Sequence, residues 1–78
     1  MLEVNCLYKA KSITNIYNED LRFISCADND ALFLVIEKFY SINLLKSFIA
    51  FKVLVNDKQA ILVFPKNSEL IERLLLKL

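Results

Sequence analysis

Apolar residues in the second half of the chain form two short runs around one polar break. Residues 48–55 (FIAFKVLV) and 60–64 (AILVF) are rich in β-branched and aromatic residues, and residues 56–59 (NDKQ) separate them. This pattern is typical of a β-hairpin. Pro65 has no backbone N–H to donate to a neighbouring strand, so we expect the second strand to end there.

The C-terminal segment instead has apolar residues at helical spacing. One stripe would contain Leu70, Ile71, Leu74, Leu75 and Leu78. Ser68 is a suitable N-cap, and the acidic residues Glu69 and Glu72 would lie in the first turn, where they favour the helix dipole. The sequence therefore predicts a helix that begins at Ser68 and continues toward the end of the chain.

The middle of the first half is ambiguous, because residues 31–36 are six apolar residues in a row. Such a run fits either a buried strand or a helix. The apolar pattern continues to Tyr40, and Asp28 is a suitable N-cap, which favours a second helix. Before it, residues 11–17 and 21–26 would form a first hairpin, and residues 2–8 would extend it or add an edge strand.

The two halves show a weak internal repeat, residues 1–39 and 40–78, in which each half would contain two strands and then a helix. The predicted fold class is therefore α+β, as one domain over residues 1–78. It would be a two-layer ββαββα arrangement, with both helices on one face of an antiparallel sheet.

Composition excludes several kinds of active site, because the chain contains no glycine and no histidine. Phosphate-binding loops, dinucleotide fingerprints and nucleophile elbows need glycine, and catalytic triads and most catalytic zinc sites need histidine. No catalytic residue, cofactor or metal site is predicted, and we expect the chain not to be an enzyme.

Charge and cysteine content point to an ordinary intracellular protein. Ten basic and nine acidic residues give a net charge of +1, which provides no overall attraction to nucleic acid or to an acidic membrane. The start of the chain lacks the pattern of a secretory signal, and no apolar run is long enough to cross a bilayer. Cys6 and Cys26 are expected to be reduced thiols. We therefore expect a cytoplasmic protein without a membrane partner.

The predicted hairpin is apolar on both faces, which is unusual for a sheet that helices cover on one side only. If Val55 pairs with Ala60, one face is wholly uncharged and should take the helices. The other face would carry Phe48, Ala50, Lys52, Leu54, Ile61 and Val63. We interpret these six residues as a protein or homodimer interface. The alternative is a different fold in which the N-terminal segment covers them.

A different use of the same face is nucleic-acid binding. The first hairpin would add Lys11 and Arg22 to Lys52 and Phe48, so that cations and an aromatic ring share an open sheet.

The leading functional hypothesis is a small non-catalytic protein-binding module that acts as a homodimer or by surface docking. An inhibitor of a host or defence protein, encoded by a virus, phage or mobile element, is one form that such a module could take, and its location would then be the host cytoplasm. The alternatives are a nucleic-acid-binding protein, and an accessory subunit or toxin-like enzyme that uses carboxylates such as Glu19 and Asp20.

Overall fold

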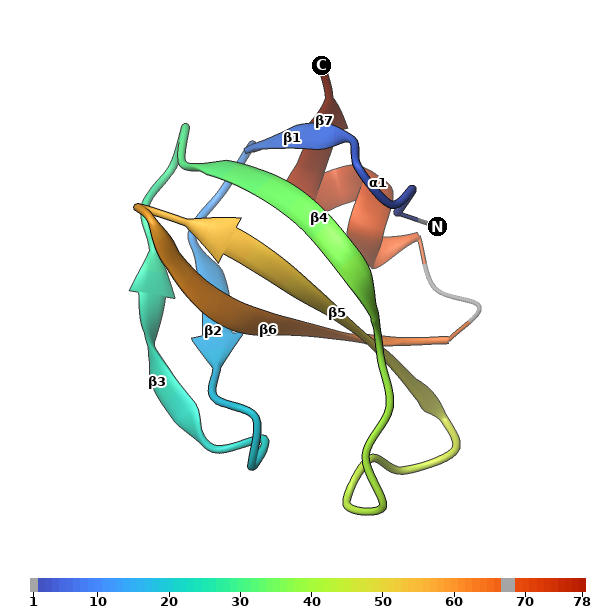
Figure 1. The fold of residues 1–78 in the computed structure, drawn as a ribbon. Coiled ribbons are helices and arrows are strands. Elements are labelled where there is room, and N and C mark those ends of the chain that lie inside the picture. Colours follow the sequence, from blue (N-terminus) through green and yellow to red (C-terminus); the bar gives the residue numbers. More distant parts are fainter. Residues whose placement is uncertain (1, 67–68) are drawn as a thin grey trace.

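The computed structural model describes residues 2–66 and 69–78 of the chain. Their fold is almost entirely antiparallel sheet, with one short helix near the C-terminus (Figure 1). The elements are β1 (Leu7–Ala10), β2 (Thr14–Tyr17), β3 (Phe23–Ala27), β4 (Leu32–Phe39), β5 (Phe48–Val55), β6 (Lys58–Pro65), α1 (Leu70–Leu74) and β7 (Leu75–Lys77).

The first four strands form one long antiparallel ribbon that bends in its middle. β1 pairs with β4 on one side of the bend, and β2 pairs with β3 on the other. At the bend the two segments of the ribbon remain hydrogen-bonded to each other. Ala10 N donates to Ala31 O at 2.8 Å, and Asp30 N donates to Ala10 O at 2.9 Å. The ribbon is therefore continuous, although its strands are interrupted.

The two halves of this ribbon flank the β5–β6 hairpin, since β4 pairs with β5 and β2 pairs with β6. The strand order is β3-β2-β6-β5-β4-β1-β7. Only residues 11–13 separate β1 from β2, yet these strands lie on opposite sides of the hairpin. The sheet must therefore curl, and Figure 1 shows the resulting half-barrel.

The predicted β5–β6 hairpin is present, but its turn is tighter than the sequence suggested. Val55 pairs with Lys58, where Ala60 was expected, and the turn contains only Asn56 and Asp57. Their φ angles of 52° and 62° are those of the left-handed region, as in a type I′ turn. Because the register differs by two residues, the same side chains still share a face.

The hydrophobic core lies inside the curl, on what we call the inner face. The hairpin contributes buried Ile49, Phe51, Val53, Val55, Ala60, Leu62 and Phe64. The ribbon adds Tyr8, Phe33 and Val35 to the same cluster, and Ile71 and Leu74 of α1 pack against it. The uncharged face of the hairpin is thus buried as expected, but mainly by other strands.

The helix predicted over residues 31–40 is wrong, because this segment is the strand β4. Phe33 and Val35 are buried while Leu32 and Leu34 are exposed, which is the two-residue period of a strand. The apolar run gave no sign of this alternation, because both faces are apolar. β4 fills the position between β5 and β1, where it satisfies backbone groups of both neighbours.

The C-terminal helix is much shorter than predicted, and the two-layer α+β class is therefore wrong. α1 ends at Leu74, and Leu75 already has an extended backbone with φ −128° and ψ 137°. Residues 75–77 then add β7 to the free edge of β1, where Leu78 N donates to Leu7 O at 2.9 Å. The proposed cap, Ser68, lies outside the described residues.

Two further expectations change with the fold. The weak repeat aligns residues 30–39 with residues 69–78. The first of these segments forms the strand β4, whereas the second forms the helix α1 and the short strand β7. The N-terminal strand is β1 rather than residues 2–8, and it lies between β4 and β7 rather than at an edge.

The turn sequence leads to a stability prediction. Replacing Asp57 by Gly should stabilise the protein by about 0.5–1 kcal/mol, because an L-residue is disfavoured at positive φ and Asn-Gly is the preferred type I′ pair. A higher urea midpoint at unchanged slope would show this. Lys58→Gly, at the first residue of β6, is the control and should destabilise by about the same amount. A destabilised Asp57→Gly protein would contradict the turn geometry.

The core leads to a second prediction. Phe51 is almost completely buried at the centre of the inner face, so Phe51→Ala should cost about 3–5 kcal/mol in the free energy of unfolding. Phe23→Ala on β3 is the matched control, because Phe23 is exposed and its loss should cost less than about 1 kcal/mol. If the two substitutions lowered the free energy of unfolding equally in urea, the assignment of Phe51 to the core would be wrong.

Candidate functional site

The six residues predicted as an interface all lie on β5 and β6, on the side opposite the core, which we call the outer face. They differ in exposure. Ala50 and Ile61 are completely buried, at 0% and 1% exposure, whereas Phe48, Lys52, Leu54 and Val63 are partly exposed. The six therefore do not form one open surface.

Two connecting segments come close to the centre of the outer face. The end of β2 contributes Tyr17, and the turn that follows it contributes Leu21. The loop between β4 and β5 contributes Leu44 and Leu45. These side chains line one hollow together with Phe48 and Val63. The central outer face is thus sheltered by local loops, rather than by the N-terminal segment or a helix.

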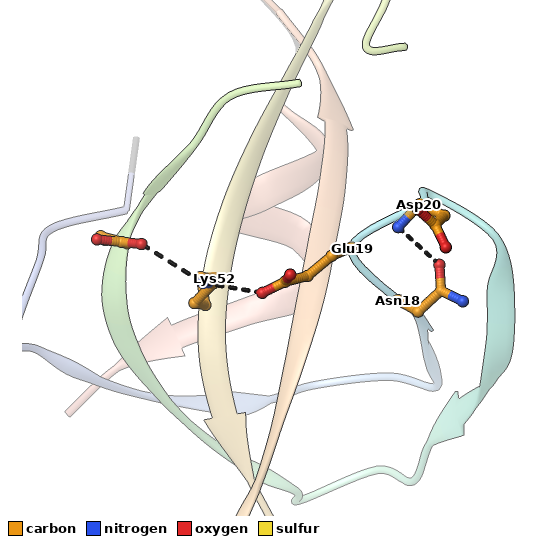
Figure 2. A network of polar contacts seen from close by, with 5 residues as sticks. Asn18, Glu19, Asp20 and Lys52 are labelled. Atoms are coloured by element: carbon orange, nitrogen blue, oxygen red, sulfur yellow. Dashed lines mark hydrogen bonds and ion pairs between the residues drawn. The ribbon is translucent and has the colours of Figure 1, made fainter. Parts of the chain in front are cut away.

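Lys52 occupies the middle of this sheltered region. Its Nζ lies 2.9 Å from Glu19 Oε1 and 3.6 Å from Glu37 Oε1, so that it bridges the β2–β3 turn and β4. Figure 2 shows Lys52 between the two carboxylates. The hydrogen bond to Glu19 raises the pKa of Lys52 above its ordinary value, and the charges of both carboxylates add to this while desolvation opposes it.

The two residues considered as an acid–base pair, Glu19 and Asp20, make different contacts. Glu19 extends toward Lys52, whereas the backbone N–H of Asp20 donates to Asn18 Oδ1 at 2.9 Å (Figure 2). Asn18 Oδ1 also accepts from the Arg22 N–H at 3.0 Å. This network holds the β2–β3 turn in place. The carboxylate that shares a partner with Glu19 is that of Glu37, through Lys52.

The four residues predicted to bind nucleic acid are not gathered in one place. Lys11 lies before β2 and donates from Nζ to Glu72 O at 2.6 Å, next to α1. Arg22 follows the turn at the other end of β2. Lys52 is held by its two carboxylates, and Phe48 lies at the start of β5.

A more exposed apolar surface lies elsewhere on the outer face, where β1, β4, β5 and β7 meet. The strand register places Leu7, Leu34 and Leu54 in one row across the sheet. Leu32, Lys9 and Leu76 form the adjacent row. Together with the terminal residue these leucines form the leucine surface: Leu7, Leu32, Leu34, Leu54, Leu76 and Leu78.

Most of this leucine surface is open to solvent. Five of its leucines have exposed fractions between 37% and 60%, and Leu54 is partly buried. Leu7, Leu32, Leu34 and Leu54 line a hollow of about 430 Å³. Directly opposed residues of antiparallel strands share a face, so Leu7, Leu34 and Leu54 form a continuous apolar row. In the adjacent row, Lys9 lies between Leu32 and Leu76.

Ion pairs of both signs lie at the edge of the leucine surface. Lys9 Nζ is 3.4 Å from Asp30 Oδ1, and Lys77 Nζ is 2.9 Å from Glu3 Oε2. The hydrogen bond and charge of Lys77 lower the pKa of the Glu3 carboxyl, and the same contact raises the pKa of Lys77. The edge is therefore polar without a strong excess of either charge.

Sequence reasoning identified only Leu54 of this surface. Leu32 and Leu34 were assigned to a helix, and Leu76 and Leu78 to the end of another. The leucines of β4 could have been found by treating residues 31–36 as a strand. The two-residue period of a strand places Phe33 and Val35 on one face and Leu32 and Leu34 on the other.

Within residues 2–66 and 69–78, no group of His, Cys, Asp or Glu side chains is arranged to hold a metal ion. Cys6 is partly buried and Cys26 is exposed, and both are free thiols. The described residues include no helix that is long and apolar enough to cross a membrane.

Comparison with protein-family models, with curated proteins and with solved structures found no match to the chain. The comparisons therefore give no evidence for the viral or inhibitory role that the sequence suggested. Any functional argument rests on the residues of this chain alone.

The Lys52 geometry gives a prediction for its ionisation. Glu19→Gln should lower the Lys52 pKa toward the ordinary lysine value, and Glu37→Gln should lower it less, because the Glu37 contact is longer. The pH dependence of the Lys52 Cε chemical shift would measure both effects. Glu69→Gln, which removes the partner of Arg73, is the control and should leave the Lys52 pKa unchanged. An unchanged pKa in Glu19→Gln would contradict the contact.

Proposed function

We propose that this protein is a non-catalytic protein-binding module that forms a homodimer through its leucine surface. The observation that carries the proposal is the group of five leucines, 37–60% exposed, side by side on one face of the sheet. Monomeric proteins rarely leave a large contiguous apolar area open to water, and such areas usually mark contact sites.

The size of the surface suits a reversible contact. The exposed leucine area is roughly 400 Å², near the largest apolar patches of ordinary monomers. Burial of this area in a contact between two copies stabilises association, and the ordering cost of roughly 4–15 kcal/mol per association event offsets part of that gain. A moderate dimer, in which polar edge residues add further area, is therefore the expected product.

The charges at the edge favour a second copy of the chain as the occupant. Lys9, Asp30, Glu3 and Lys77 place both signs beside the leucines. A strongly charged partner would meet no opposite excess of charge here. Across a twofold axis, in contrast, a surface that carries both signs allows positive groups of one copy to face negative groups of the other. β7 also lies at one end of the described strand order, so its outer edge is next to the same surface.

The alternative, nucleic-acid binding by Lys11, Arg22, Lys52 and Phe48, has less support in the geometry. Two carboxylates neutralise Lys52, and Lys11 and Arg22 lie at opposite ends of β2. Salt dependence separates the two functions. Self-association through leucines should change little with ionic strength, whereas nucleic-acid affinity should fall steeply. The enzyme alternative that uses Glu19 and Asp20 also has less support, since Lys52 holds the Glu19 carboxylate beside that of Glu37.

Charge introduced into the leucine surface should abolish the dimer. Leu32→Glu and Leu76→Glu, both at half-exposed positions, are expected to remain folded and to weaken self-association by at least about 100-fold. The dimer would bury the new carboxylates, and pairing with the neighbouring Lys9 offsets only part of the desolvation cost. Sedimentation velocity over a concentration series would measure this, and circular dichroism would confirm folding. These positions are preferable to Ile61, which is buried.

Ile13→Glu is the matched control, because Ile13 is an exposed apolar residue in the β1–β2 bend, outside the leucine surface. It should dimerise like the unmodified protein. A strictly monomeric unmodified protein, or folded Leu32→Glu and Leu76→Glu proteins with unchanged association, would refute the proposed function.

A further inference from the structure

The basic residues around the loop between β4 and β5 (residues 40–47) differ from those elsewhere in the structure. A hollow of about 370 Å³ beside this loop is lined by Lys38, Lys46 and Lys66, together with Tyr40 and Phe48. In the sequence, no acidic residue occurs between Glu37 and Asp57. The net charge of +1 therefore conceals a local excess of positive charge at this end of the sheet.

These three lysines have no carboxylate partner within the described part of the chain. The ion pairs found there use Lys9, Lys52, Arg73 and Lys77 instead. Among the described residues, Lys38 is the only one of these three lysines that contacts an aromatic ring. Its Nζ lies 5.6 Å from the centre of the Tyr40 ring. Their charge is thus available to an anionic partner.

The same loop exposes large apolar side chains at its tip. Ile42 is 100% exposed and Leu45 is 67% exposed, and Tyr40 is also open to water. Full exposure of an isoleucine between lysines provides no stabilisation to the monomer. These apolar groups therefore need an environment that the described chain does not supply.

Backbone hydrogen bonds give the loop a defined shape. Ser41 O accepts from Leu44 N at 3.1 Å, and Ser41 Oγ accepts from Asn43 N at 3.1 Å. At its end, Lys66 N donates to Ser47 O at 2.8 Å, which joins the loop to the end of β6. The exposed apolar tip and the lysines are thereby held on one end of the molecule.

We propose that the loop of residues 40–47 binds the surface of anionic membranes. Ile42, Leu45 and Tyr40 enter the boundary between headgroups and acyl chains, while Lys38, Lys46 and Lys66 contact lipid phosphates and carboxylates. Interfacial binding combines buried apolar area with attraction of lysines to anionic lipids, and both elements are present here. Tyrosine and long lysine side chains suit this boundary, since each has an apolar body and a polar end.

The nature of the exposed residues favours a membrane over nucleic acid. Single-stranded nucleic acid is bound by several aromatic rings on which successive bases stack. The most exposed side chain here is the aliphatic Ile42, and Tyr40 is the one aromatic residue of the loop. The site contains no arginine, the residue best suited to bidentate recognition of phosphate. Lipid headgroups are mobile and can move toward a point charge, so their binding does not need a planar, bidentate group. Lysine side chains supply such point charges beside the apolar tip of the loop.

This membrane site is separate from the proposed dimer surface. The loop joins Phe39 at the end of β4 to Phe48 at the start of β5, whereas the leucine surface includes Leu32 and Leu34 at the start of β4 and Leu54 near the end of β5. Because β4 and β5 are antiparallel, the loop lies at one end of this strand pair and the leucine surface lies at the other end. A dimer would therefore leave the loops free.

Co-sedimentation of the full chain with lipid vesicles tests the inference. The protein should bind vesicles of mixed phosphatidylcholine and phosphatidylserine at least about tenfold more tightly than vesicles of phosphatidylcholine alone. Ile42→Ser should weaken binding to the mixed vesicles about tenfold or more, because it removes the apolar insertion. The double variant Lys46→Glu, Lys66→Glu should abolish the preference for phosphatidylserine.

Two controls match these changes at sites away from the loop. Ile13→Ser removes an exposed isoleucine in the β1–β2 bend, and Lys58→Glu reverses an exposed charge at the opposite end of the β5–β6 hairpin. Both should bind mixed vesicles like the unmodified protein. All of the substituted residues are exposed, so folding should be retained, and circular dichroism would verify it.

Three results would overturn the inference: no vesicle binding, equal binding to both vesicle types, or loop variants that behave like the controls. Binding of a labelled single-stranded oligonucleotide that depends on Lys46 and Lys66, without vesicle binding, would assign the loop to nucleic acid instead. Sedimentation velocity without lipid measures the dimer independently, so failure here leaves the proposed function intact.

Discussion

Pairing of the bent ribbon along both edges of the β5–β6 hairpin is the constraint on which the rest of the structure depends. β4 must reach one edge and β2 the other, although only residues 11–13 connect β1 to β2. A flat sheet could not satisfy both pairings, so the sheet curls around the hairpin. The curl creates an inner side that holds the core and an outer side whose residues are available for contacts.

The curl also divides the outer side into three regions with different properties. In the centre, Ala50 and Ile61 are buried, and Lys52 joins the β2–β3 turn to β4. At one end of β4 and β5 the leucines are exposed with balanced charges at their edge, and at the other end unpaired lysines surround an apolar loop. Overall charge conceals this arrangement, because the ion pairs of the described residues use other basic residues and leave the lysines near the loop without a carboxylate partner.

Prediction from the sequence succeeded where partners are close in the chain. Residues 48–55 and 60–64 form a hairpin across a two-residue turn, and β2 and β3 form another, so local pattern and turn residues identify them. Prediction failed for residues 32–39, where apolar residues on both faces of the strand conceal its alternation, and for residues 75–77, whose partner β1 is distant in the chain. The C-terminal apolar residues have helical spacing, but the helix α1 ends at Leu74, and Leu75 already has an extended backbone.

The sequence by itself determined which hairpin residues face the core, because side chains of a strand alternate with a period of two and the register differs from the expected one by two residues. The same alternation explains why Val53 and Leu62 remain on one face despite the tighter turn. Only the tertiary structure decided which outer residues are covered. Exposure of Leu34 and burial of Ile61 depend on long-range pairing and on which loops lie over the sheet, and hydrophobicity alone does not distinguish the two residues.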